Sequence, residues 1–127
     1  MKNKMRQPKS EKYITYENDR VEPYYSFLKN GYKSIEGRIK KKWYRDLKPG
    51  DHIIVHNMEK TDSFETVVQD VRTYSSIREM LEKEQLKKLL PDIDTVEQGI
   101  AVYRRFYTEE AEKEFGVVAI EVKHYLK

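Results

Sequence analysis

Apolar and polar positions alternate between residues 34 and 39, and this period of two predicts a β-strand. Ile35 and Ile39 would lie on one face of that strand, whereas Glu36 and Arg38 would lie on the other. The strand is therefore expected to pack an apolar face against a core and to turn a charged face away from it.

Further segments rich in β-branched and aromatic residues predict more strands in the same sheet. They cover residues 13–16, 52–57, 64–74 and 117–122. A Lys48-Pro49-Gly50-Asp51 turn leads into the second of them, because proline and glycine in sequence favour a tight reversal.

Helical spacing of apolar residues appears between these strands. A short helix over residues 23–29 should end at Gly31, and a longer one over residues 77–90 should run from a Ser76 cap to Pro91. A third helix should follow Thr95, and an acidic helical turn should run from Thr108 to residue 116. The order of elements predicts an α+β fold.

Composition limits the classes of protein and of site. The chain has 127 residues, enough for one domain, with a charged fraction of 37%, a formal charge of +3 and no cysteine. We expect a basic flexible tail over residues 1–11 and a single domain over residues 12–127. Because the N-terminus lacks an apolar signal segment and no apolar run is long enough for a membrane span, we expect a cytoplasmic protein that does not contact a membrane.

No cofactor or metal site is predicted. His52 and His56 stand four residues apart, about 13 Å along a strand, which is too far for two ligands on one ion. Asp92 and Asp94 lack the glycine and the final glutamate of a calcium loop.

A basic segment follows the strand over residues 34–39. Residues 38–48 hold six lysines and arginines against one acid, and Lys40, Lys41 and Lys42 directly precede Trp43. Cations beside aromatic rings are typical of single-stranded nucleic-acid binding. The alternative is a solvated loop whose tryptophan packs into the core, and the sequence leaves both open.

A second group of cations and rings lies at the end of the third predicted helix. Arg104 and Arg105 stand between Tyr103 and Tyr107. The four residues suit RNA binding, and they equally suit a surface helix with a buried aromatic face.

Lys33, Glu36 and Arg38 are the candidates for a ligand site. Lys33 and Glu36 would point to opposite faces of one regular strand, so they converge only if the strand begins after Lys33 or bulges there. Gly31 makes such a start plausible. In the simpler alternative, Glu36 and Arg38 only pair with each other on the strand.

These residues carry a resemblance to a known family. Gly31, Lys33, Glu36 and Arg38, followed by a basic loop and then Leu47-x-Pro49-Gly50-Asp51, resemble the ASCH domain family, a branch of the PUA-like fold. Later segments strengthen the similarity in the same order, from Tyr74-Ser75-Ser76-Ile77 through Gln98-Gly99-Ile100 to Gly116-Val117-Val118. The resemblance covers roughly residues 20 to 123.

The resemblance implies a small mixed β-barrel with two or three helices packed around it, and a cleft beside the barrel. It also implies RNA or a nucleotide as partner. Some bacterial members hydrolyse N(4)-acetylcytidine with a lysine, a threonine three residues later and a glutamate further on. Lys33 matches that lysine, but Glu36 stands at the threonine position.

Three functions therefore remain open. The first is an RNA- or nucleotide-binding domain whose cleft contains Lys33, Glu36 and Arg38. The second is a hydrolase acting on a modified nucleoside or on RNA, with Lys33 as general base and Glu36 as its partner. The third is a protein-interaction domain in a regulatory complex, since a fold does not fix a function.

Overall fold

A computed structural model describes residues 12–126 of the chain. The basic tail predicted over residues 1–11 and the last residue of the predicted domain, Lys127, lie outside them. The elements in chain order are β1 (Thr15–Arg20), α1 (Tyr24–Lys29), β2 (Ile35–Ile39), the 3-10 helix η1 (Lys42–Arg45), β3 (His52–Asn57), β4 (Ser63–Tyr74), α2 (Ile77–Lys83), α3 (Leu86–Leu89), α4 (Val96–Arg104), α5 (Glu109–Phe115) and β5 (Val117–His124).

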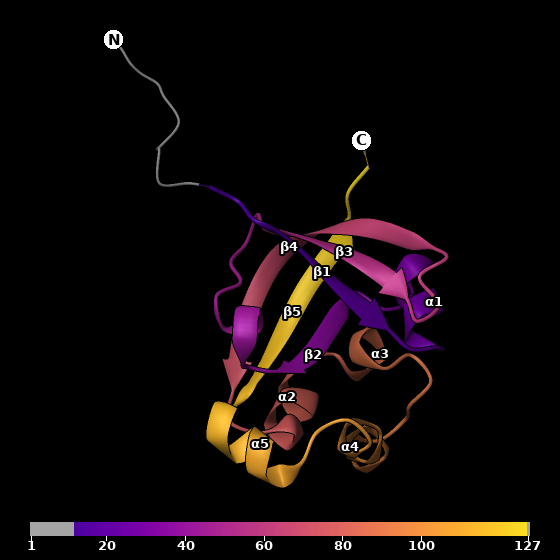
Figure 1. Cartoon of the computed structure of the whole chain (residues 1–127). Helices are drawn as coiled ribbons and strands as arrows, with labels where there is room; N and C mark the ends of the chain where they lie inside the picture. The colour runs from indigo at the N-terminus through magenta and orange to yellow at the C-terminus, as the bar shows by residue number, and fades with distance from the viewer. Residues whose placement is uncertain (1–11, 127) are drawn as a thin grey trace.

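The five strands form one curled sheet, a half-barrel (Figure 1). Their spatial order is β1-β3-β4-β5-β2, in which β1 runs parallel to β3 and all other neighbours are antiparallel. The predicted α+β class and PUA-like barrel type are confirmed. β1 and β2, which are far apart in this order, are the two edges of the sheet.

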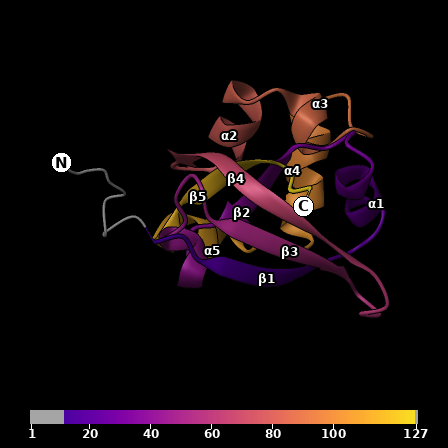
Figure 2. The ribbon, with the colours of Figure 1, turned by 90° about the horizontal axis from the view of Figure 1, so that it is seen from above.

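Hydrophobic clusters cover both faces of the sheet. On β5, Val117 and Ala119 belong to a cluster with α2, α3 and α4, whereas Val118 and Ile120 belong to a second cluster with α1, β3 and β4. Figure 2 shows α2 and α3 on the side of the sheet away from β1. Because β5 is covered on both faces, its sequence is a continuous apolar run rather than an alternating one.

The predicted helix ends are largely where the capping residues place them. Thr95 and Gln98 form a reciprocal capping box at the start of α4, and the Ser76 side chain accepts a hydrogen bond from the backbone of Glu79 at the start of α2. Gly31 follows α1 with a φ of 85°, a conformation that glycine adopts without strain.

The helix predicted over residues 77–90 is wrong as a single element, because the chain leaves the helical conformation at Glu84. The Glu84 carboxylate accepts hydrogen bonds from Arg72 Nε and Nη2 at 2.7 and 2.8 Å and from the Tyr74 hydroxyl at 2.5 Å. These contacts with β4 fix Glu84 in an extended conformation and divide the segment into α2 and α3. The helices around the barrel are consequently shorter and more numerous than expected.

The face of β2 that was expected to point away from the core is also covered. Glu36 is only 3% exposed, and Ile35, Gly37 and Ile39 are buried as well. A strand at one edge of a sheet thus has protein on both faces, and its charged side chains point into the interior of the curl.

Candidate functional site

A cavity of about 220 Å³ lies where the curl of the sheet brings the edge strands β1 and β2 near each other. We call it the seam pocket. One group of its lining residues is charged: Asp19, Arg20, Lys33, Glu36 and Arg38. The others are apolar, aromatic or small: Val21, Tyr24, Gly37, Met58, Leu90, Val102, Tyr103, Phe106 and Tyr107.

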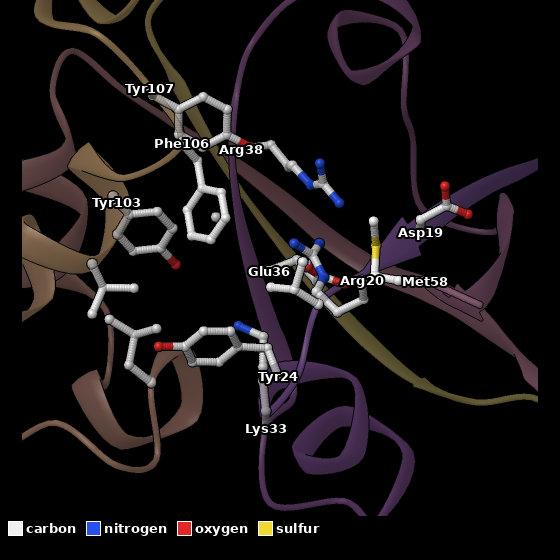
Figure 3. A pocket seen from close by; sticks show the side chains of 14 residues that line it. Asp19, Arg20, Tyr24, Lys33, Glu36, Arg38, Met58, Tyr103, Phe106 and Tyr107 are labelled. Carbon is white, nitrogen blue, oxygen red and sulfur yellow. The ribbon is translucent and has the colours of Figure 1, made fainter. Parts of the chain in front are cut away.

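Three of the rings lie across the pocket from the two arginines, whereas Met58 lies beside Arg20 and Tyr24 lies beside Lys33 (Figure 3). The rings of Tyr103, Phe106 and Tyr107 come from α4 and the segment after it, and they face the charged side chains of Arg20 and Arg38 from the two edge strands. The pocket therefore has a ring wall and a charged wall.

Lys33 lies at one end of the charged wall. It precedes β2, in the turn that Gly31 opens, so the strand does begin after Lys33 and the lysine shares the pocket with Glu36. Its Nζ donates to the carbonyl oxygens of Ile35 at 2.7 Å and Leu89 at 2.5 Å. Burial, with the nearby cations of Arg20 and Arg38, holds the pKa of Lys33 well below its usual value.

Glu36 forms an ion pair with Arg20, the last residue of β1. The simple pairing of Glu36 with Arg38, one of the alternatives for the strand, is not observed. The Glu36 side chain is 5% exposed and that of Arg20 is 15% exposed, so this is a buried pair that links the two sheet edges. Burial and the neighbouring Arg38 lower the pKa of Arg20 to about 9, which leaves the guanidinium charged at neutral pH.

Arg38 is held by an aromatic ring rather than by a carboxylate. Its Cζ lies 4.9 Å from the centroid of the Tyr44 ring, a cation–π contact, and the Tyr44 hydroxyl accepts a hydrogen bond from Asn18 Nδ2 at 3.0 Å. The buried Nε and Nη2 atoms of Arg38 have no acceptor among residues 12–126. Arg38 thus brings unused donors to the charged wall.

Tyr103 packs closely against β2 because position 37 has no side chain. A Cβ atom at Gly37 would lie 2.7 Å from the Tyr103 hydroxyl oxygen and 2.6 Å from Met80 Cε. Burial raises the pKa of Tyr103 above its usual value, so its hydroxyl stays protonated. Gly37 therefore allows a neutral hydroxyl to reach the floor of the pocket.

The basic loop lies outside the seam pocket. Lys40 Nζ donates to Thr73 Oγ1 at 3.2 Å, and Lys41 lies over the Phe115 ring at 5.5 Å. Lys42 is exposed at the start of η1.

The half-buried indole of Trp43 stacks with Tyr16 at 4.4 Å and with Tyr44 at 3.9 Å. Through these two contacts Trp43 packs against the second hydrophobic cluster, the one formed with α1, β3 and β4. This agrees with the alternative in which the loop is solvated and its tryptophan packs into the core.

The candidates at the end of α4 separate into two kinds. Tyr103 and Tyr107 line the seam pocket. Arg104 instead pairs with Glu112 at 2.5 Å, and Arg105 lies over the Phe106 ring at 5.4 Å on the surface. The geometry brings together the two tyrosines, Lys33, Glu36 and Arg38, but leaves both of these arginines outside the cavity.

Sequence reasoning missed Arg20, Tyr24 and Phe106. Arg20 stands between Asp19 and Val21 in a mixed stretch without a motif. In the sequence, Tyr24 and Phe106 occupy apolar positions of predicted short helices. Only the assembled fold brings them to a cavity.

His52 and His56 each face a carboxylate rather than each other. His52 Nδ1 lies 2.6 Å from Glu65, and His56 Nε2 lies 2.6 Å from Glu17. Among residues 12–126, histidine and acidic side chains do not gather in threes around a possible metal position. In the same range, every helix is too short or too polar to cross a membrane.

Comparison with known proteins places the chain in a family. A family model described as "ASCH domain" matches residues 20–125. The fold is similar to that of the hypothetical protein PH0355 (TM-score 0.79, 42% identity, covering 87% of this chain and 99% of that one). It is also similar to protein PF0455 from Pyrococcus furiosus (TM-score 0.70, 40% identity, covering 89% and 99%).

A more distant structure shares the fold alone. Protein EF3133 from Enterococcus faecalis V583 superimposes with a TM-score of 0.59 at 12% identity, covering 80% of this chain and 66% of that one. No curated protein matches the chain at a significant level. With a family match over most of its length and two similar structures at 40% identity or more, the chain belongs to the ASCH domain family, which has a PUA-like fold.

Proposed function

We propose that this ASCH domain binds RNA or a free nucleotide by taking one nucleotide into the seam pocket. The observation that carries the proposal is the arrangement of a ring wall opposite a charged wall in one cavity. Nucleotides combine a planar base with an anionic backbone, so they need stacking surfaces and cations close together.

The size of the pocket suits a single base or nucleoside. Its volume of about 220 Å³ lies below the roughly 300–1,000 Å³ of sites that enclose drug-sized ligands. One base or nucleoside is therefore a better match than two stacked units. A longer RNA would continue over the surface, where the basic loop over residues 40–42 is available for phosphates.

Both walls provide hydrogen-bonding groups for a nucleotide. The Tyr103 hydroxyl on the ring wall donates to or accepts from a base edge, and the unused N–H groups of Arg38 on the charged wall donate to anionic oxygens. A buried donor without an acceptor is unfavourable, so a ligand that supplies acceptors gains free energy on entering.

Phe106 offers the sharpest test of the proposed function. Its ring is 47% exposed and lines the mouth of the pocket, whereas Phe115 is 37% exposed and packs near Lys41, away from the pocket. Because stacking of one base contributes about 1–3 kcal/mol, Phe106→Ala should weaken binding of nucleosides and of short single-stranded RNA at least about fivefold. Phe115→Ala, the matched control, should leave that affinity unchanged.

Binding can be measured by calorimetry and mapped by amide chemical shifts. The largest ligand-induced shifts should include the amides of Gly37 and Arg38. Shifts confined to other surfaces, or equal affinities for both phenylalanine variants, would place the ligand outside the seam pocket.

A second function is favoured by the state of Lys33. A lysine with a lowered pKa has a larger neutral fraction at neutral pH, and a neutral amine is a general base. Its two N–H bonds are directed at the Ile35 and Leu89 carbonyls, which leaves the lone pair of the neutral form unused. Glu36 is engaged by Arg20, so the base in an amidohydrolase reaction would be Lys33 alone.

The hydrolase alternative has a direct assay. Wild-type protein incubated with N(4)-acetylcytidine should release cytidine, and Lys33→Met should abolish the release. If wild-type protein binds the nucleoside without releasing cytidine, the domain is a binding module and not an amidohydrolase for this substrate.

A further inference from the structure

The charges that line the seam pocket do not balance. The Asp19 carboxylate is engaged by Lys60 at 2.5 Å, and the Glu36 carboxylate is engaged by Arg20. Arg38 has no carboxylate partner within the part of the chain that the structure describes. Both acids of the charged wall are thus already paired, and the Arg38 guanidinium has no carboxylate of its own.

The unused donors of the arginines lie beside that surplus charge. Arg38 Nε and Nη2, together with Arg20 Nε, are buried atoms that lack acceptors among residues 12–126. A guanidinium presents its N–H groups as a planar fork, which matches two oxygens of a phosphate or carboxylate. These arginine N–H groups are therefore suited to an anionic group that a ligand supplies.

Aromatic residues outside the pocket orient the Arg38 side chain. Its guanidinium rests on Tyr44, which stacks on Trp43, which in turn stacks on Tyr16 of β1. Figure 3 shows the guanidinium groups of Arg20 and Arg38 on the side of the pocket opposite the rings of Tyr103 and Phe106. An acceptor held by both arginines would therefore belong to a ligand whose planar part lies on the ring wall.

We propose that the anionic group is a terminal phosphate monoester, so that the seam pocket takes a nucleoside monophosphate or the phosphorylated end of an RNA strand. Arg38 and Arg20 hold the phosphate oxygens, and Tyr103 and Phe106 hold the base. This inference rests on the proposed function and names the chemical class of its ligand.

A terminal phosphate fits better than an internal phosphodiester for two reasons. A monoester carries close to two negative charges at neutral pH and three free oxygens, whereas a diester carries one charge and two free oxygens. An internal nucleotide also needs room for chain to enter and to leave, and a cavity of about 220 Å³ is small for that.

The experiment compares ligands that differ only in the phosphate. The 5′- and 3′-monophosphates of the four ribonucleosides, the parent nucleosides and inorganic phosphate are titrated into the full chain by calorimetry. At least one monophosphate should bind at least about tenfold more tightly than its nucleoside, as expected for charge-assisted hydrogen bonds to a guanidinium. A hexauridylate with a 5′-phosphate, a 3′-phosphate or two hydroxyl ends distinguishes a strand end from a free nucleotide.

Variants of Arg38 locate the effect. Arg38→Met should remove the preference for the phosphate while retaining nucleoside affinity, and Arg38→Lys should restore part of that preference. Arg78→Met serves as the control, because Arg78 is a 52% exposed arginine on α2 that pairs with Glu97 away from the pocket. Thermal melting establishes that each variant is folded. The comparison of monophosphates with nucleosides on the wild-type protein tests the inference even if a variant fails to fold.

Each result decides the inference. A monophosphate preference that Arg38→Met abolishes supports it. Equal affinities of nucleotides and nucleosides overturn the inference but leave the proposed function standing. If neither class binds, both fail, and if inorganic phosphate binds as tightly as every nucleotide, the ring wall contributes nothing and the nucleotide assignment is wrong.

Discussion

Glu36→Gln should destabilise the protein strongly, because it removes one member of a buried ion pair. The substitution preserves the size of the side chain but leaves the Arg20 guanidinium, 15% exposed, beside Arg38 without its carboxylate partner. The other acid of the charged wall, Asp19, is paired with Lys60. Loss of one partner from a buried pair costs about 3–5 kcal/mol, and we expect about 3 kcal/mol here, since water reaches the pocket. That is a large part of the roughly 5–15 kcal/mol by which a domain is stable.

The pair can be separated from its context by a double-mutant cycle. Arg20→Met, Glu36→Leu and the double variant are unfolded in urea, and their free energies of unfolding are compared with that of the wild type. The two single variants should each lose about 3 kcal/mol. The double variant should lose much less than their sum, because two apolar side chains in contact leave no charge buried alone.

Glu97→Gln is a matched control on the surface. Glu97 pairs with Arg78, but its side chain is 73% exposed, so the same chemical change should cost below about 1 kcal/mol. If Glu36→Gln costs equally little, the Arg20–Glu36 contact does not hold the two sheet edges together. Glu36 would then be available to a ligand, and the charge balance argued for the pocket would have to be revised.

Three further predictions concern the pocket and the basic loop. Burial lowers the pKa of Lys33 in the folded protein, so the unfolded chain binds more protons than the folded one between that lowered pKa and about 10.4. As the pH rises through this range, the free energy of unfolding of the wild type should increase relative to that of Lys33→Met, by up to about 1.4 kcal/mol per pH unit. Parallel urea titrations across that range measure the difference, and a constant offset would contradict it. Gly37→Ala should destabilise the protein by about 1–3 kcal/mol and weaken nucleoside binding, because the new methyl group meets side chains packed over the strand; melting and calorimetry report the two effects. When Lys40, Lys41 and Lys42 are replaced by alanine, the slope of the log binding constant for single-stranded RNA against the log salt concentration should become shallower by about 0.7 per lost phosphate contact. The affinity for mononucleotides should not change, since the loop lies outside the pocket.

Local signals in the sequence predicted much of the fold. Alternation identified β2, the capping residues Thr95 and Ser76 identified the starts of two helices, and Gly31 identified the end of a third. These signals act over a few residues, because periodicity, caps and turns each depend on the chain next to them. The order of elements then followed, and the family resemblance supplied the barrel.

Contacts between distant segments could not be predicted in this way. Glu84 stands at an ordinary helical position in sequence, and only Arg72 and Tyr74 of β4 pull it out of the helix. Trp43 lies among lysines, as a base-stacking ring would, but its contacts are with Tyr16 and Tyr44.

The candidate site was predicted in part for the same reason. Lys33, Glu36 and Arg38 are close together in sequence, so a motif could indicate them. Arg20 and Phe106 reach the pocket from other parts of the chain, and no local pattern distinguishes them from surface or core residues. The charged wall was thus incomplete, and the alternative that paired Glu36 with Arg38 did not include Arg20, the arginine that pairs with Glu36 in the structure.

The position of the pocket follows from the way the sheet closes. Backbone hydrogen bonds join every pair of neighbouring strands in the order β1-β3-β4-β5-β2, but the two edges are joined through side chains, with the Arg20–Glu36 pair as the bridge. Side chains, unlike a backbone ladder, leave a cavity between the edges and keep charged groups in it. Burial and the nearby cation of Arg38 both lower the pKa of Arg20, so the two guanidinium groups repel each other across this seam. The proposed anionic ligand would relieve that repulsion, and its binding is then expected to raise the free energy of unfolding.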